Sequence, residues 1–175
     1  MMKYLQKLGK AIMLPVAVLP VAAIMMGIGY AMCPATMQGG DVTGIIQIIG
    51  FALVKIGSAV IDKLPMLFAV GVAIGLSKDQ HGAAGLAGLV AFLTVTTVLN
   101  SGVVATMMGA EEAPLAFSKI DNAFIGIISG ITASVCYNKF SSAQLPTALA
   151  FFSGKRCVPI VTSFVMVAES AILYF

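Results

Sequence analysis

Few side chains in this sequence could take part in acid–base or metal chemistry. The single histidine, His81, ends the polar segment at residues 77–81. A histidine can carry a proton near neutral pH, whereas in a polar segment the simpler interpretation is a solvated loop residue. Cys33, Cys136 and Cys157 show no spacing typical of a metal site. They are interpreted as buried free thiols, and neither a metal nor a cofactor is predicted.

Three further polar residues stand at or inside apolar segments. Glu169 lies about eleven residues into the last apolar segment, at a depth where an ionisable side chain is costly in a membrane and often functional. Asp121 and Asn122 directly precede another apolar segment, which is typical of helix N-caps; contact with a substrate is the alternative. No catalytic triad, phosphate-binding loop or metalloprotease motif is present, so no catalytic residue is predicted.

The composition indicates that these residues are held by membrane-spanning helices. The 175 residues are 59% hydrophobic and 10% charged, with a mean hydropathy of +1.03. Soluble domains average about 45–50% apolar and about 25% charged residues, so this chain lacks the charge to cover a surface in water. Its net charge of +3 is spread without a basic stripe. Intrinsic disorder, a disulfide scaffold and nucleic-acid binding are therefore excluded.

Charge-poor segments predict an all-α, polytopic membrane protein. Residues 11–33 carry no charge and exceed the apolar part of a signal peptide, so we expect a permanent membrane span. Residues 64–76 make only about 20 Å of helix, which suggests a tilted or re-entrant segment. The full set of apolar segments comprises residues 11–33, 42–61, 64–76, 82–99, 123–137 and 158–175.

The segment at residues 42–61 differs from the others because its polar residues form a stripe. On a helical wheel Gln47, Lys55, Ser58 and the following Asp62 fall within about 80° of one another. This pattern is typical of an amphipathic helix lying in the membrane plane or facing a cavity. With this helix in the plane, the positive-inside rule gives five transmembrane helices and a cytoplasmic N-terminus. Cytoplasmic basic residues would then be Lys3, Lys7, Lys10, Lys78, Lys139, Lys155 and Arg156, with Glu111 and Glu112 outside.

Glycines recur at intervals of three or four residues within the apolar segments. Gly71 and Gly75 share one segment, and Gly126 and Gly130 share another. Such spacing lines one helix face with accessible backbone, so these four glycines are predicted to lie at helix contacts. Close packing within one bundle and a specific dimer face both fit the pattern.

A short motif precedes the last apolar segment and is predicted to lie on the cytoplasmic side. Gly154, Lys155 and Arg156 are followed by Pro159, a residue that the first turn of a helix tolerates. Lys155 and Arg156 would lie at the level of the lipid headgroups and act as a cytoplasmic anchor.

Four motifs, in this order, resemble the membrane-embedded IIC domain of bacterial phosphotransferase-system sugar permeases. Within that family the sequence is most similar to the glucose and N-acetylglucosamine group, and to its N-acetylglucosamine-specific branch. The similarity covers about the first 165 residues, and the tail after about Met166 is expected to diverge. The motifs are Leu-Pro-Val-Ala-Val-Leu-Pro-Val-Ala-Ala at 14–23, the Ser-Lys-Asp turn with its glycine- and alanine-rich continuation at 77–88, Ile-Gly-Ile-Ile-Ser-Gly at 125–130, and Leu-Pro at 145–146 with Phe-Phe-Ser-Gly-Lys-Arg-Cys-Val-Pro-Ile at 151–160.

The resemblance implies a sugar transporter of the bacterial cytoplasmic membrane. In this family a IIC domain carries a sugar across the membrane, and the IIB partner, charged through IIA, phosphorylates it. The resemblance also implies a homodimer and places residues 1–175 in the N-terminal, scaffold and dimerisation half of a IIC domain. The family's sugar-binding Pro-Thr-Gly and Thr-Glu-Pro segments do not occur in this sequence. We therefore expect a truncated IIC domain without catalytic residues; the alternative is a non-transporting fragment that dimerises with or regulates a full-length permease.

Overall fold

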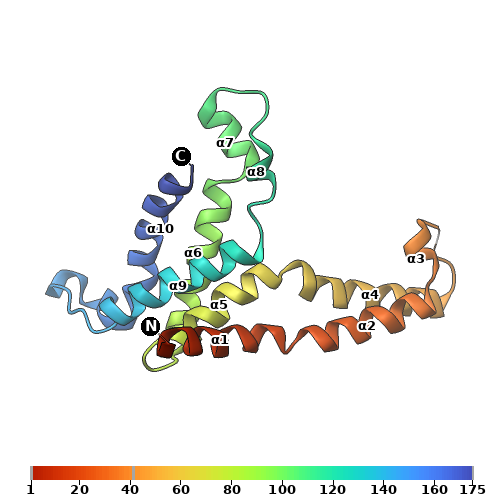
Figure 1. Cartoon of the computed structure of the whole chain (residues 1–175), viewed down its shortest axis with the longest axis horizontal. Coiled ribbons are helices and arrows are strands. Elements are labelled where there is room, and N and C mark those ends of the chain that lie inside the picture. The colour runs from red at the N-terminus through yellow and green to blue at the C-terminus, as the bar shows by residue number, and fades with distance from the viewer. Residues whose placement is uncertain (1, 41, 175) are drawn as a thin grey trace. The chain divides into compact units, whose positions relative to one another are not determined.

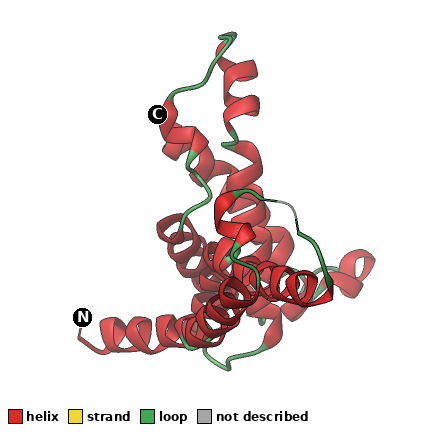
Figure 2. Ribbon diagram, turned by 90° about the vertical axis from the view of Figure 1, so that its right-hand side faces the viewer, coloured by secondary structure: helices red, strands yellow, loops and turns green. Residues whose placement is uncertain are grey.

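The computed structural model describes residues 2–40 and 42–174, which form helices and loops without a strand (Figures 1 and 2). The all-α prediction is confirmed. In chain order the elements are α1 (Met2–Val16), α2 (Leu19–Met32), α3 (Ala35–Gln38), α4 (Ile45–Asp62), α5 (Leu64–Leu76), α6 (Gly82–Val98), α7 (Ser101–Met108), α8 (Leu115–Ser118), α9 (Ala123–Phe140), the 3-10 helices η1 (Thr147–Phe152) and η2 (Gly154–Arg156), and α10 (Val158–Tyr174).

The helices belong to two compact units, of which the smaller comprises Leu14–Leu64. In this unit α2 packs against α4, and glycines let the two backbones approach. A Cβ atom on Gly29 would lie 2.6 Å from the carbonyl oxygen of Gly50. A Cβ atom on Gly57 would lie 2.7 Å from the carbonyl oxygen of Ala22. Residues late in α2 therefore face residues early in α4, so the two helices form an antiparallel hairpin.

The larger unit comprises Met1–Met13 and Pro65–Phe175. Within it α10 packs against α6 and α9, and α6 also packs against α9 (Figure 1). Small side chains make close packing possible: Ala84, Ala87, Ala91 and Ala133 are fully buried in one core cluster. A second, smaller cluster joins Ala11 of α1 to the C-terminal half of α5.

Helix length and hydropathy bear out about four to five membrane spans. Among the described residues, four helical stretches are long and apolar enough to cross: Tyr4–Met32, Ile45–Asp62, Ala123–Phe140 and Gly154–Tyr174. A fifth is possible if α6 and α7 form one broken span, bent by 48°. Asn100 makes this break, because its side chain accepts a hydrogen bond from the Gly102 N–H at 3.0 Å and starts α7 anew. The helix α7 was not predicted from the sequence.

The helices that meet the criteria of a membrane span differ from the predicted spans at α4 and α5. The predicted in-plane helix corresponds to α4, which meets the length and hydropathy criteria of a span, whereas α5 is shorter than a span, with 13 residues. The polar stripe is present, and Lys55 and Asp62 are exposed. Beside it lies a second face, made of Gly50, Val54 and Gly57, which is buried against α2. The in-plane orientation of α4 stays a prediction.

Candidate functional site

A polar cluster at one end of the larger unit joins three segments that are far apart in the sequence. The Asp79 carboxylate, in the turn between α5 and α6, accepts a hydrogen bond from the Lys155 ammonium at 2.6 Å. The same oxygen of Asp79 accepts a hydrogen bond from the Tyr137 hydroxyl of α9 at 3.0 Å. The Tyr137 side chain is buried, whereas Asp79 and Lys155 are each a little over two-fifths exposed. We call Asp79, Tyr137 and Lys155 the loop cluster.

The loop cluster rests on a second set of hydrogen bonds made by Asn138. Its side-chain oxygen accepts from the Lys78 N–H at 2.8 Å, and its side-chain nitrogen donates to the Leu76 carbonyl oxygen at 3.1 Å. The Lys78 ammonium donates to the main-chain carbonyl oxygen of Asn138 at 3.2 Å. Asn138 thus satisfies a free carbonyl at the end of α5 and fixes the turn that carries Asp79.

The electrostatics of the loop cluster favour an ionised Asp79. The hydrogen bond from the Lys155 ammonium, with that from Tyr137, lowers the pKa of Asp79 from 3.8 to about 2, although partial burial opposes the shift. The carboxylate is therefore negative throughout the physiological pH range. The pair neutralises one of the basic residues predicted to lie on the cytoplasmic side.

The anchor motif is held by the backbone geometry of Gly154. This residue has φ +69°, a left-handed conformation that glycine adopts without strain, and its N–H donates to the Ala143 carbonyl oxygen at 2.8 Å. Lys155 then reaches the loop cluster. Arg156 instead turns to Phe151, with its guanidinium 5.0 Å from the ring centre. Pro159 occupies the first turn of α10, as expected.

The four glycines predicted at helix contacts lie within the larger unit. Gly71 and Gly126 are buried, and a Cβ atom on Gly126 would overlap the carbonyl oxygen of Pro65 in α5. A Cβ atom on Gly130 would lie 2.8 Å from both the Ala69 carbonyl oxygen and the Val72 Cβ atom. Gly126 and Gly130 of α9 therefore face α5 of the same chain.

Gly75 has a different neighbour. A Cβ atom at this position would overlap the Ala11 methyl group of α1. Its contact joins α5 to the N-terminal helix within the larger unit.

The residues predicted to cap or to carry protons have local structural roles. Asn122 is the N-cap of α9, because its side-chain oxygen accepts from the Ile125 N–H at 3.0 Å; the capping prediction is confirmed. His81 is exposed and caps α6, accepting from the Ala83 N–H at its Nδ1 atom. Glu169 is half-buried and accepts a hydrogen bond from the Thr132 hydroxyl of α9 at 2.9 Å. Neither His81 nor Glu169 belongs to the loop cluster.

The three cysteines are free and buried, as predicted. In the described part of the chain, no three His, Cys, Asp or Glu side chains lie close enough together to hold a metal ion.

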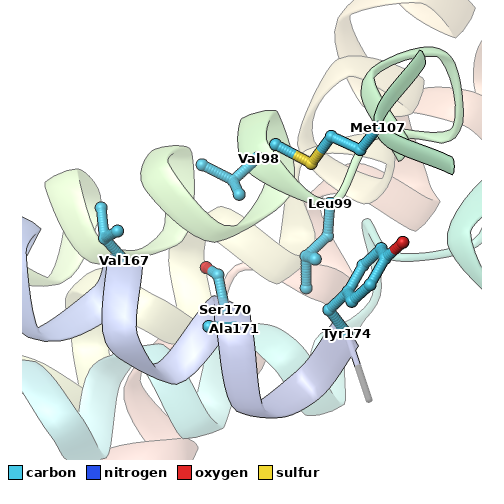
Figure 3. A pocket seen from close by; sticks show the side chains of 7 residues that line it. All are labelled: Val98, Leu99, Met107, Val167, Ser170, Ala171 and Tyr174. Atoms are coloured by element: carbon cyan, nitrogen blue, oxygen red, sulfur yellow. The ribbon is translucent and has the colours of Figure 1, made fainter. Parts of the chain in front are cut away.

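Two apolar pockets of similar size lie against α10. One, of about 400 Å³, is formed where α10 faces the end of α6, Leu99 and Met107 near the end of α7 (Figure 3). The buried Ser170 hydroxyl is in its wall and has no hydrogen-bond partner among the described residues. The other, of about 390 Å³, lies at the N-terminal end of α10 beside the anchor motif. Neither has the many convergent polar groups that a sugar requires.

Several of these residues were not singled out by sequence reasoning. Asp79 and Lys155 were each noticed but not paired, because 76 positions separate them. A usable signal existed: Asp79 is the only acidic residue in the segments predicted to be cytoplasmic. The close contacts of Gly29 with Gly50 were also missed, although Gly50 and Gly57 are one heptad apart and must share a helix face.

The chain is similar to known proteins over nearly its entire length. The family model described as "Phosphotransferase system, EIIC" matches residues 9–175, which include the tail predicted to diverge. The N-acetylglucosamine-specific EIICB component of the phosphotransferase system of Bacillus subtilis (strain 168) is 38% identical over 174 residues. That match covers 98% of this chain and 32% of the relative, so the chain spans about a third of the relative's length. The chain therefore belongs to the EIIC family of the phosphotransferase system.

Proposed function

We propose that this chain is a membrane part of a transporter that takes up N-acetylglucosamine and couples uptake to phosphorylation by a IIB partner. The observation that carries this proposal is the 38% identity to an N-acetylglucosamine-specific EIICB component over almost the entire chain. N-acetylglucosamine is proposed as the sugar because the relative is specific for it. Glucose is the alternative within the same group. IIB and IIA are the proposed phosphoryl donors, and the bacterial cytoplasmic membrane is the proposed location.

The role of this chain in transport is proposed to be that of a scaffold that also forms the dimer. Its best-defined interactions join helices and loops to one another: α2 to α4 through glycines, α9 to α5 through Gly126 and Gly130, and three loops through Asp79. The two pockets against α10 are apolar. These features support a role in which this chain positions the sugar site and does not itself supply the groups that bind the sugar.

The loop cluster supports a cytoplasmic location for the N-terminus. It brings the turn with Lys78 and the segment with Lys155 to one end of the larger unit. Ala11, which follows the N-terminal lysines, packs against Gly75 near the same end of α5. Basic segments that share one end of a helical bundle are those that the positive-inside rule places in the cytoplasm.

A chimera tests the proposed function. This chain would replace the matched third of the Bacillus subtilis relative, and uptake of radiolabelled N-acetylglucosamine and glucose would be compared in cells lacking both permeases. We expect N-acetylglucosamine uptake near that of the parent and less uptake of glucose. The 175-residue chain alone, supplied with phosphorylated IIB, is expected to phosphorylate neither sugar. A chimera that inserts and dimerises normally but transports no N-acetylglucosamine would refute the proposal.

A further inference from the structure

The apolar pocket at the start of α10 has the shape and lining of a site for a hydrocarbon chain. It has a volume of about 390 Å³, within the usual range of ligand pockets. No polar side chain lines it. Its walls come from the loop before η1, the end of η1, the residue before α10 and the first two turns of α10, namely Leu145, Phe152, Cys157, Ile160, Val161 and Phe164. Phe152 and Phe164 are exposed, so the pocket opens at the protein surface. We call it the α10 slot.

A cation without an acidic partner stands beside this slot. Arg156 precedes the slot residue Cys157, and its Nη1 atom donates to the carbonyl oxygen of Phe151, next to the slot residue Phe152, at 3.4 Å. This is the one hydrogen bond that the structure gives to its five N–H donors within residues 2–40 and 42–174. No carboxylate of the described residues forms an ion pair with it, whereas the adjacent Lys155 is paired with Asp79.

The Arg156 side chain is nevertheless held in place. Its guanidinium stacks 5.0 Å from the centre of the Phe151 ring, and Phe151 packs edge-to-face on Phe152 at 5.3 Å between ring centres. The Phe151 ring is itself largely exposed. An exposed aromatic pair beside a held guanidinium is suited to the boundary between acyl chains and headgroups.

We propose that the α10 slot and Arg156 together bind one anionic phospholipid, with an acyl chain in the slot and the phosphate on the guanidinium. Charge complementarity selects this occupant, because the free donors of Arg156 match a phosphate group and the slot matches hydrocarbon. A zwitterionic lipid offers the same chain and phosphate, but its own ammonium group competes for that phosphate. The site is independent of the sugar that the protein transports.

Native mass spectrometry of the purified chain tests this site. The chain in detergent would be titrated with phosphatidylglycerol or phosphatidylcholine of identical acyl chains. The affinity for the first bound lipid would be measured from the fraction of chains that carry one lipid. We expect tighter binding of phosphatidylglycerol. Arg156→Gln should weaken it about fivefold to tenfold, as expected for the loss of one basic contact. Arg156→Lys, which keeps the charge, should recover part of the affinity.

The neighbouring lysine provides a matched control. Lys155→Gln removes the same charge one residue away, yet should reduce the preference for phosphatidylglycerol much less than Arg156→Gln does, because Lys155 is already paired with Asp79. Val161→Phe, which narrows the slot, should weaken binding of both lipids. Circular dichroism and gel filtration would establish that each variant is folded.

Three results would overturn the proposal. They are equal affinity of the native chain for the two lipids, equal loss of preference in Arg156→Gln and Lys155→Gln, and full competition by glycerol phosphate without an acyl chain. The last result would assign a phosphate site alone and leave the slot without a role.

Discussion

At the scale of single residues, the clearest feature is the ion pair between Asp79 and Lys155. It is partly exposed, and surface pairs contribute little to stability on their own. Its value here lies in position, because it joins a turn after α5 to a segment before α10 and is supported by the buried Tyr137. Removing the pair should loosen the association of these loops more than it lowers overall stability.

The pH dependence of this pair follows from the direction of the shift. The pKa of Asp79 is lowered in the folded protein to about 2. A carboxyl group with a lowered pKa adds stability above its unfolded pKa, and that contribution is lost as pH falls through the folded value. The native chain should therefore lose part of its stability between about pH 4 and pH 2.

The variant Asp79→Asn should be less stable than the native chain at pH 7 and should approach it at pH 2. Thermal unfolding in detergent, followed by circular dichroism at several pH values, measures this difference. A constant difference between the two chains across the range would show that Asp79 does not titrate as proposed.

A second residue-scale prediction concerns Gly130. Leucine at this position would collide with the Ala69 carbonyl oxygen and with Val72, so Gly130→Leu should destabilise the protein by about 1–3 kcal/mol. Ile128→Leu on the same helix, at a half-buried position, is the control and should be tolerated. The retained fraction of folded protein after heating in detergent measures both. Equal tolerance would mean that α5 can move away from α9 at no cost.

At the scale of elements, helix boundaries were largely predictable because charges and polar caps interrupt the apolar runs. The predicted segment 64–76 is α5 with the same boundaries, and 82–99 differs from α6 by one residue. The helix α7 was missed because its start depends on Asn100, a single capping side chain after an apolar run. The loop cluster was missed for a different reason: a sequence pattern records neighbours along the chain, not contacts 58 and 76 residues apart.

The start of α9 gives an element-scale prediction. Asn122→Ala removes the cap of the first turn and should cost about 1 kcal/mol of stability. Asp121→Ala is the matched control, because Asp121 is exposed and precedes the cap without a hydrogen bond in the described structure. Chemical denaturation in mixed micelles compares the two variants. A larger loss of stability in Asp121→Ala than in Asn122→Ala would show that Asn122 is not the residue that caps α9.

The orientation of α4 can be decided by one position. If α4 lies in the membrane plane on the outer side, a cysteine replacing Lys63 should react with an impermeant maleimide added to intact cells. If α4 crosses and α5 does not, that cysteine should be protected from outside. Because each alternative has one crossing between residues 45 and 76, both leave the turn at 77–81 on the same side. Cys33, Cys136 and Cys157 are replaced first.

At the scale of the whole molecule, we predict on which side of the membrane two loops lie. The loop that contains Ser142 should be cytoplasmic, and the loop with Glu111 and Glu112 should face outward. Single cysteines at positions 142 and 112, in a chain without its native cysteines, would be labelled with an impermeant reagent in intact and in permeabilised cells. We expect labelling at 112 in both and at 142 only after permeabilisation. Labelling of position 142 in intact cells would contradict the proposed cytoplasmic N-terminus.

The glycine-lined contact of α2 with α4 also bears on how the protein is synthesised. All residues of this hairpin lie within Leu14–Leu64, a continuous stretch that leaves the ribosome before Pro65. At roughly 5–20 residues per second, the chain from Pro65 onward needs about 6–22 s more. By then the residues that face Gly29, Gly50 and Gly57 in the hairpin have all been made. The two apolar helices can thus pair with each other before any later segment of the chain has been made.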